Sequence, residues 1–117
     1  MARATQKEDV PGSFEQLVLL AVLRLGERAY GMTVRQELEE QTENAVSLGA
    51  VYATLERLEK KGYVSPRSAP GGAEREGRAK RFFIVEGAGV QALRRALEAL
   101  DRMRMDLPGL EPVEVRR

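Results

Sequence analysis

The densest run of apolar positions lies near the start of the chain and predicts a first helix over residues 13–25. Apolar side chains cover most of its circumference, so we expect it to be buried on more than one side, by its own domain and by a second subunit. Ser13 lies three residues before Gln16, the spacing of a capping box, and Gly26 is the expected helix stop. The polar residues 1–12 are expected to form a mobile arm.

Two shorter helices follow, each with one apolar stripe. The first of them spans residues 32–41, with Val34 and Leu38 facing inward. The other is capped by Ser47 and closed by Gly62. Its inner stripe has the helical spacing i, i+4, i+7 and consists of Val51, Leu55 and Leu58. The pattern therefore predicts three helices before residue 62.

The period then changes from that of a helix to that of a strand and predicts a hairpin. Residues 63–65 form the first strand and residues 80–85 the return strand, joined by a glycine- and proline-rich segment over residues 68–79. Phe82 and Phe83 point to opposite faces of the return strand because side chains alternate along it. One of them is expected in the core, and the other fills the gap below the final helix.

A final amphipathic helix is expected from residue 86 to about residue 107, followed by a frayed tail over residues 108–117. Its apolar stripe consists of Val90, Leu93, Leu97, Leu100, Met103 and Leu107. A seam of barely two heptads is too short to form a coiled coil alone. The chain is therefore predicted to be mainly α-helical with one small β-hairpin.

Composition excludes most catalytic and metal chemistry. The chain has no cysteine and no histidine, which removes disulfides, thiolate and imidazole metal ligands, cysteine nucleophiles and histidine-based triads. Glu98 and Asp101 lie at i, i+3 on one helix face, but this spacing is common on solvated helices. We therefore expect no enzyme activity, no metal and no cofactor.

The chain shows no signal for membrane insertion or export. Its longest apolar run, residues 17–23, has seven residues, against the roughly 20 that a bilayer needs. Residues 1–9 lack the apolar core of a signal peptide. The expectation is a cytoplasmic protein with no membrane partner.

Charge is concentrated in one segment. The whole chain carries a net charge of +1 from 19 basic and 18 acidic residues. Residues 56–81 hold eight basic and four acidic residues, so this segment is +4 and the rest of the chain is −3. A localised basic stretch indicates contact with a polyanion, and the alternative is a solvated charged face.

Three short helices followed by a hairpin is the order of a winged helix-turn-helix. In this fold the third helix enters the major groove, and the hairpin, called the wing, contacts the DNA backbone or minor groove. The same order occurs in modules that bind only proteins. Residues 15–23 and 29–34 resemble the opening of the PadR family of bacterial transcriptional regulators. Residues 47–62 are similar to its recognition helix, and residues 77–83 to its wing-exit strand, a basic pair followed by two aromatic residues.

This resemblance implies a homodimeric repressor that binds a palindromic DNA operator, and it allows a small-molecule effector of unidentified chemistry. The short family members have a single C-terminal helix that packs against the first helix of the partner. The implied interface residues are Phe14, Leu17, Val18, Ala21, Val90, Leu93, Leu97, Leu100, Met103 and Leu107. Where relatives open this helix with Thr-Pro, the chain has two glycines in residues 86–89, at a cost of about 0.5–1 kcal/mol each, which leaves the start of the helix open.

Residues opposite the inner stripe of the third helix are candidates for DNA contact. They include small residues that let the helix backbone approach base edges, and the methyl group of Ala50 or Ala53 can contact thymine. Arg57 is expected to contact a base or a phosphate unless an intrahelical Glu56–Lys60 pair restrains it. The complete expected set is Ser47, Gly49, Ala50, Tyr52, Ala53, Thr54, Arg57 and Lys60 on the helix, and Arg75, Arg78, Lys80 and Arg81 in the wing.

Three side chains near the expected interface have structural as well as functional interpretations. Ser47 is first a helix cap, and a serine there can also donate to a phosphate. Tyr52 is expected to be half buried with its hydroxyl reaching a phosphate, whereas Tyr30 is expected to be structural. The competing hypothesis is a winged helix that binds proteins and no DNA, through the acidic residues Glu37, Glu39, Glu40 and Glu43.

Overall fold

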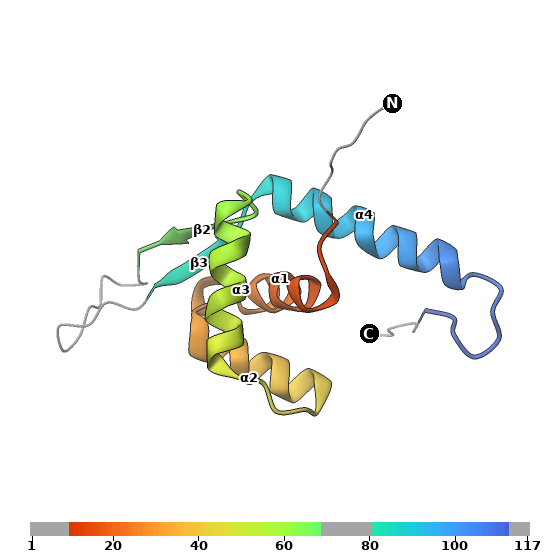
Figure 1. Cartoon of the computed structure of the whole chain (residues 1–117), viewed down its shortest axis with the longest axis horizontal. Coiled ribbons are helices and arrows are strands. Elements are labelled where there is room, and N and C mark those ends of the chain that lie inside the picture. The colour runs from red at the N-terminus through yellow and green to blue at the C-terminus, as the bar shows by residue number, and fades with distance from the viewer. Residues whose placement is uncertain (1–9, 69–80, 113–117) are drawn as a thin grey trace.

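Three helices, an antiparallel hairpin and a long final helix follow one another along the chain, which confirms the predicted fold (Figure 1). The computed structural model describes residues 10–68 and 81–112. The elements are α1 (Ser13–Leu25), the 3₁₀ helix η1 (Gly26–Arg28), α2 (Gly31–Thr42), α3 (Leu48–Lys60), β2 (Val64–Arg67), β3 (Phe82–Val85) and α4 (Gly87–Arg104).

The first helix begins where the pattern predicts, but its cap is a different residue. Gly12 is the residue before the helix, and its backbone N–H donates to the Glu15 carboxylate at 3.1 Å. The prediction that Ser13 and Gln16 form the capping box is therefore wrong by one position, since Ser13 is already the first helical residue. Gly26 ends α1 with a positive φ of 60°, as expected of a glycine stop.

Helix α1 supplies the centre of the hydrophobic core. Val18 and Leu19 have no exposed surface, and the other helices and the hairpin pack around them. The inward stripes predicted for α2 and α3 are confirmed by residues that are at most 3% exposed: Val34, Leu38, Val51, Leu55 and Leu58. The remaining face of α1 keeps Leu17 and Leu23 exposed, at 37% and 46%.

The two strands pair antiparallel from Val64 opposite Val85 to Arg67 opposite Phe82. The first strand is therefore longer than predicted and continues through Pro66. The return strand is shorter at its start, because Arg81 precedes the first paired residue. A two-stranded sheet leaves an outer edge on each strand, which is where a proline without an N–H is tolerated.

The two phenylalanines of β3 are both buried, at 7% for Phe82 and 3% for Phe83. Phe83 belongs to the core, and its N–H donates to the carbonyl of Ala29 at 2.9 Å. Phe82 packs on the ring of Tyr30, with ring centroids 5.0 Å apart. The expectation that the second phenylalanine fills the gap below the final helix is wrong, whereas the structural assignment of Tyr30 is correct.

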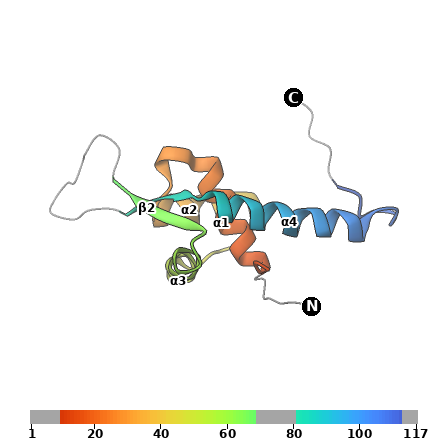
Figure 2. The ribbon, with the colours of Figure 1, turned by 90° about the horizontal axis from the view of Figure 1, so that it is seen from above.

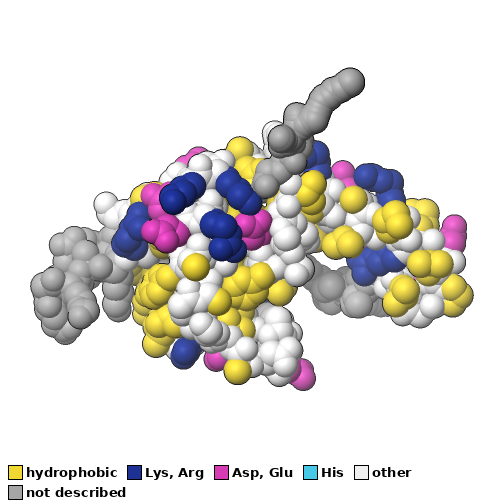
Figure 3. Space-filling model, viewed as in Figure 1, with side chains coloured by type: hydrophobic (Ala, Val, Ile, Leu, Met, Phe, Trp, Pro, Cys, Tyr) yellow, Lys and Arg dark blue, Asp and Glu magenta, His cyan; other side chains and the backbone are white. Residues whose placement is uncertain are grey.

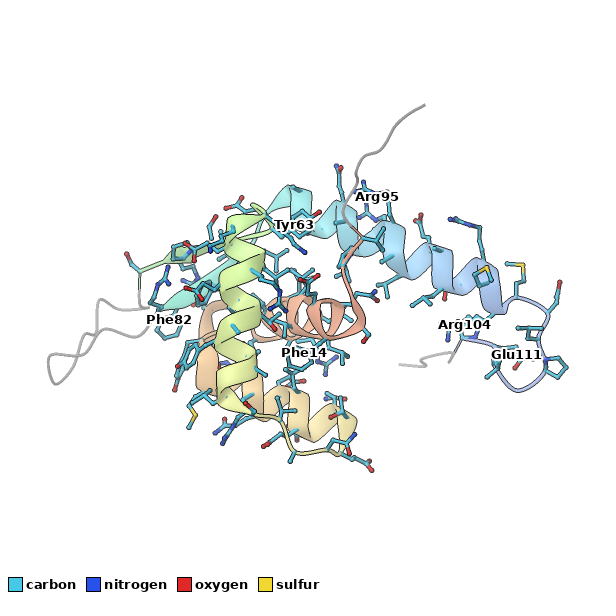
Figure 4. The ribbon with its side chains drawn as sticks, viewed as in Figure 1. Phe14, Tyr63, Phe82, Arg95, Arg104 and Glu111 are labelled. Atoms are coloured by element: carbon cyan, nitrogen blue, oxygen red, sulfur yellow. The ribbon has the colours of Figure 1, made fainter. Side chains whose placement is uncertain are left out.

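The packing at the start of α4 explains why one of its two glycines is needed there. The helix begins at Gly87, after Glu86, whose N–H donates to the carbonyl of Tyr63 at 2.8 Å. Gly89 packs on the same carbonyl so closely that a Cβ there would collide with the oxygen. Tyr63 lies between the C-terminal end of α3 and the start of α4 (Figure 4). The glycine that costs helix stability is therefore needed for the approach of two backbones.

Only the first half of α4 is packed on the domain. Ala92, Leu93 and Ala96 are buried, and the helix then extends away from the other elements (Figure 2). Helix α4 ends at Arg104, and Leu107 lies beyond it. The helix therefore ends three residues before the end of the predicted segment at residue 107, and the stripe loses its helical phase before that residue.

Candidate nucleic-acid interface

Helix α3 lies along one side of the molecule, and its outer face is open to solvent (Figures 1 and 2). Ser47 caps the helix by accepting a hydrogen bond from the N–H of Ala50 at 3.0 Å, as predicted. Gly49, Ala50 and Ala53 are exposed, and so is Lys60 at the far end. The N-terminal half of α3 therefore presents small side chains, which leave room for a close approach of the helix backbone.

Tyr52 ties this face to the start of α2. Its residue surface is 50% exposed, as the half-buried prediction requires. Its ring lies against the backbone of Gly31, where an added Cβ would collide with ring carbons and with the hydroxyl. Gly31 is thus a positioning residue for Tyr52, a role that the sequence analysis did not predict.

Among the residues of α3 predicted to contact DNA, Thr54 is buried. It is 2% exposed, and its hydroxyl accepts a hydrogen bond from Nη2 of Arg57 at 3.1 Å. The position is three residues after Val51 and four before Leu58, so it falls on the inner stripe. Thr54 cannot contact DNA directly, and instead it holds the side chain of Arg57.

Arg57 has a partner that no local spacing suggests. Its Nε donates to Oε2 of Glu15 at 3.2 Å, across 42 residues of sequence, while 54% of its side chain stays exposed. Lys61 donates to both oxygens of the same carboxylate, at 3.0 and 3.2 Å. The predicted restraint by a Glu56–Lys60 pair is therefore replaced by an ion-pair cluster between α1 and α3.

Glu15 is the acidic centre of this cluster and is only 7% exposed. Burial alone raises the pKa of a carboxyl group, but the hydrogen bonds from Lys61, the Gly12 N–H and Arg57 outweigh it and lower the pKa of Glu15 below its ordinary value. The carboxylate therefore stays charged at neutral pH. Local spacing predicts neither of its cationic partners, because Arg57 and Lys61 come from a distant segment of the chain.

Of the wing residues predicted to contact DNA, Arg81 lies within the described part of the chain. Nη2 of Arg81 donates to Glu59 of α3 at 3.2 Å, and its guanidinium lies 5.3 Å from the centre of the Phe83 ring. More than half of its side chain remains exposed. The other predicted wing contacts lie outside the described residues: Arg75, Arg78 and Lys80.

Charge is mixed along the exposed side of α3. Figure 3 shows basic and acidic side chains interleaved over the C-terminal end of the helix, while hydrophobic and uncharged groups lie around its N-terminal half. The interleaving follows from the pairs Arg57–Glu15 and Arg81–Glu59. The candidate interface thus combines an uncharged region of small side chains with a flank of cations that are already ordered.

The residues expected to form a dimer interface divide into three groups by their exposure. Val18, Ala21 and Leu93 are at most 4% exposed within one chain, so the prediction that they contact a partner is wrong, and they are core residues. Phe14, Val90 and Leu97 are partly buried. Large exposed surfaces remain on four others: Leu17 (37%), Leu100 (51%), Met103 (76%) and Leu107 (45%).

A groove of about 430 Å³ opens between the end of α1 and the hairpin. Its lining is mainly apolar, with Glu27 and Arg67 as its charged members. The guanidinium of Arg67 also lies 5.8 Å from the centre of the Phe82 ring. The volume is that of a small-molecule site, but no motif in the sequence predicts these residues as ligand contacts.

Comparison with known proteins decides the family. The model of the transcriptional regulator PadR-like family matches residues 19–95. The chain belongs to this family. PadR-like proteins are transcriptional regulators rather than enzymes, so the absence of catalytic chemistry predicted from the sequence is supported at the family level.

Several solved protein structures have the same fold as this PadR-like regulator. A PadR-like transcriptional regulator from Bacillus cereus has a TM-score of 0.66 at 18% identity, over 86% of this chain and 93% of that chain. A PadR family regulator from Eggerthella lenta has a TM-score of 0.60 at 22% identity, over 78% and 76%. A complex structure of hsRosR-S1 has a TM-score of 0.57 at 27% identity, over 81% and 78%.

Two other findings complete the comparison. The search of curated proteins found no significant match. Within residues 10–68 and 81–112, each helix is too short or too polar to cross a bilayer.

Proposed function

We propose that this PadR-like regulator binds double-stranded DNA by placing the N-terminal half of α3 in the major groove. The exposed small face of α3 carries this proposal. Gly49, Ala50 and Ala53 let the backbone come close to base edges, and the free N–H groups at the start of the helix favour a phosphate. Membership of a family of transcriptional regulators supports DNA as the partner.

The same proposal includes a set of phosphate contacts on both sides of that face. Tyr52 lies at its edge, and Lys60 and Arg57 follow toward the C-terminal end of α3. Arg81, which directly precedes β3, lies near the same end of α3 because it pairs with Glu59. Each phosphate contact that is formed adds about 0.9 to the magnitude of the slope of log K against log salt.

We further propose that the regulator acts as a homodimeric repressor on a palindromic operator. Leu100 and Met103 are exposed on a helix segment that leaves the domain, and exposed apolar side chains of this size mark a protein contact. Leu17, exposed on α1, is the surface that a partner's α4 would cover. Two copies would then place two α3 helices about one DNA turn apart.

Two of the four acidic residues that motivated the competing protein-interaction hypothesis have partners within the chain. Of the acidic residues that motivated it, Glu37 pairs with Arg24 at 2.8 Å, and Glu39 accepts a hydrogen bond from the N–H of Val46 at 2.9 Å. These carboxylates hold α2 to its neighbours within the chain. DNA binding is therefore the function that we propose.

The test places a large acidic side chain on the small face. Ala53 is exposed, so Ala53→Glu should leave the fold unchanged. Its carboxylate would meet base edges and phosphates, and DNA affinity should therefore fall about 100-fold or more. Ala88→Glu, exposed at the start of α4, is the matched control. Fluorescence anisotropy with a DNA fragment from upstream of the gene measures both. Equal affinity of Ala53→Glu and the wild type would refute the proposal.

A further inference from the structure

One buried carboxylate lies under the C-terminal end of α3 and holds two of its cations. Oε1 of Glu15 accepts hydrogen bonds from the Gly12 N–H and from Lys61, at 3.1 and 3.2 Å. Oε2 accepts from Arg57 at 3.2 Å and from Lys61 at 3.0 Å. All four bonds converge on one side chain, so its loss would free the cluster as a whole.

The cluster leaves the outer edge of one guanidinium available. Arg57 uses Nε for Glu15 and one N–H of Nη2 for Thr54, and a guanidinium has five N–H donors. With 54% of the side chain exposed, the remaining donors on the terminal nitrogens are those that a phosphate would accept from. An arginine ordered in this way loses less side-chain entropy when it binds than a free one does.

We infer that Glu15 is a positioning residue for DNA binding: it fixes Arg57 from behind so that the guanidinium meets a phosphate beside the groove that α3 occupies. The inference rests on the proposed DNA binding. Glu15 itself does not touch DNA, because it is buried beneath the helix. Its effect on binding is exerted through Arg57.

Charge and position act in opposite directions at this site, which makes the inference testable. Neutralising Glu15 adds one unit of positive charge to the cluster of Arg57 and Lys61, and electrostatics alone would then strengthen binding to any DNA. Loss of positioning instead weakens binding, because Arg57 no longer meets the phosphate. The sign of the change therefore separates the two effects.

The experiment is a double-mutant cycle with Glu15→Gln, Arg57→Ala and the double variant, measured by anisotropy on operator DNA and on a scrambled duplex. We expect each single variant to lose about tenfold in operator affinity, as for one charge-assisted contact, and the double variant to be no weaker than Arg57→Ala. Affinity for the scrambled duplex should fall in parallel in Glu15→Gln, because a phosphate contact does not depend on the base sequence. Additive losses in the double variant, or unchanged or higher affinity of Glu15→Gln for both duplexes, overturn the inference.

A second variant keeps the test decisive if Glu15→Gln does not fold at the temperature of measurement. Thr54→Val removes the other inward hydrogen bond of Arg57 with little change in volume, and it should lower the affinity for both duplexes a few-fold. Unchanged operator affinity in folded Thr54→Val overturns the inference in that case. If the wild type binds neither duplex, the proposed function itself has failed, and this outcome is distinct from a failed cycle.

Discussion

Helices α3 and α4 are both amphipathic, but they expose different kinds of side chain on their outer faces. Helix α3 is packed along its whole length and exposes glycine, alanine, Tyr52 and charged residues. Helix α4 is packed only over its first half and exposes Leu100 and Met103 beyond it. Small exposed residues permit a close approach to a grooved polyanion, whereas large exposed apolar residues gain free energy only when a protein covers them. The exposed composition therefore separates a nucleic-acid face from a protein face.

The largest effect on stability is expected at the inner stripe of α3. Leu55→Ala removes a side chain that is 1% exposed and leaves a cavity, which should lower the free energy of unfolding by about 2–5 kcal/mol. Urea denaturation at a fixed protein concentration measures this change. Ala53→Gly, on the outer face of the same helix, is the control and should cost about 1 kcal/mol or less. Similar losses at both positions would contradict the assignment of the two faces.

The far end of α4 should control self-association and leave the domain folded. Leu100→Asp combined with Met103→Asp places two charges in the proposed interface, and we expect dimer dissociation to become about 100-fold easier. Sedimentation equilibrium gives the dissociation constant. Gln91→Asp, exposed in the packed half of α4, is the matched control. If the double variant remains as dimeric as the control, the partner lies elsewhere on the chain.

The two glycines at the start of α4 should respond in opposite directions to alanine. Gly89→Ala drives a methyl group into the carbonyl of Tyr63 and should destabilise the domain by about 1–3 kcal/mol. Gly87→Ala meets open space and should stabilise it by up to about 1 kcal/mol through helix propensity. Thermal unfolding of the pair separates packing from propensity. Stabilisation by both substitutions would show that α4 does not approach the α3–β2 connection this closely.

The smallest expected effect is the pH dependence that Glu15 confers on α3. Because its pKa in the folded state is lowered from about 4.5, its charged form stabilises the fold above that pH, and this contribution disappears as the pH falls through the lower folded-state pKa. The stability difference between the wild type and Glu15→Gln should therefore be largest at pH 7 and shrink toward pH 3. Denaturation curves at several pH values measure it. A difference that does not change with pH would mean that the carboxylate is not charged in the cluster.

Predictions from the sequence are accurate where the cause is local. The stripes Val34–Leu38 and Val51–Leu58 are correct because a helix brings residues three and four apart onto one face, whatever the rest of the chain does. The cap at Ser47 is correct for the same reason, since its acceptor and donor are three residues apart. The family follows from such local blocks in their order along the chain.

Predictions fail where a residue's partner comes from a distant segment. Phe82 was expected below α4, but it packs on Tyr30, which the hairpin reaches only by folding back over the end of η1. Val18, Ala21 and Leu93 were expected at a dimer interface because the resemblance to the PadR family implies that the final helix packs against the first helix of a partner. The chain itself buries them. Periodicity indicates that a face is covered without saying by which surface.

The sequence by itself determined the order of the elements, their inner faces and the small outer face of α3, because these depend on the spacing of residues within one helix or strand. Tertiary structure alone decided that Gly31 accommodates Tyr52, that Gly89 meets the backbone at Tyr63, and that Glu15 holds Arg57. These contacts join residues separated by 21 to 42 positions. Their geometry exists only after the helices have packed, since loop closure and packing, rather than local spacing, bring the groups together.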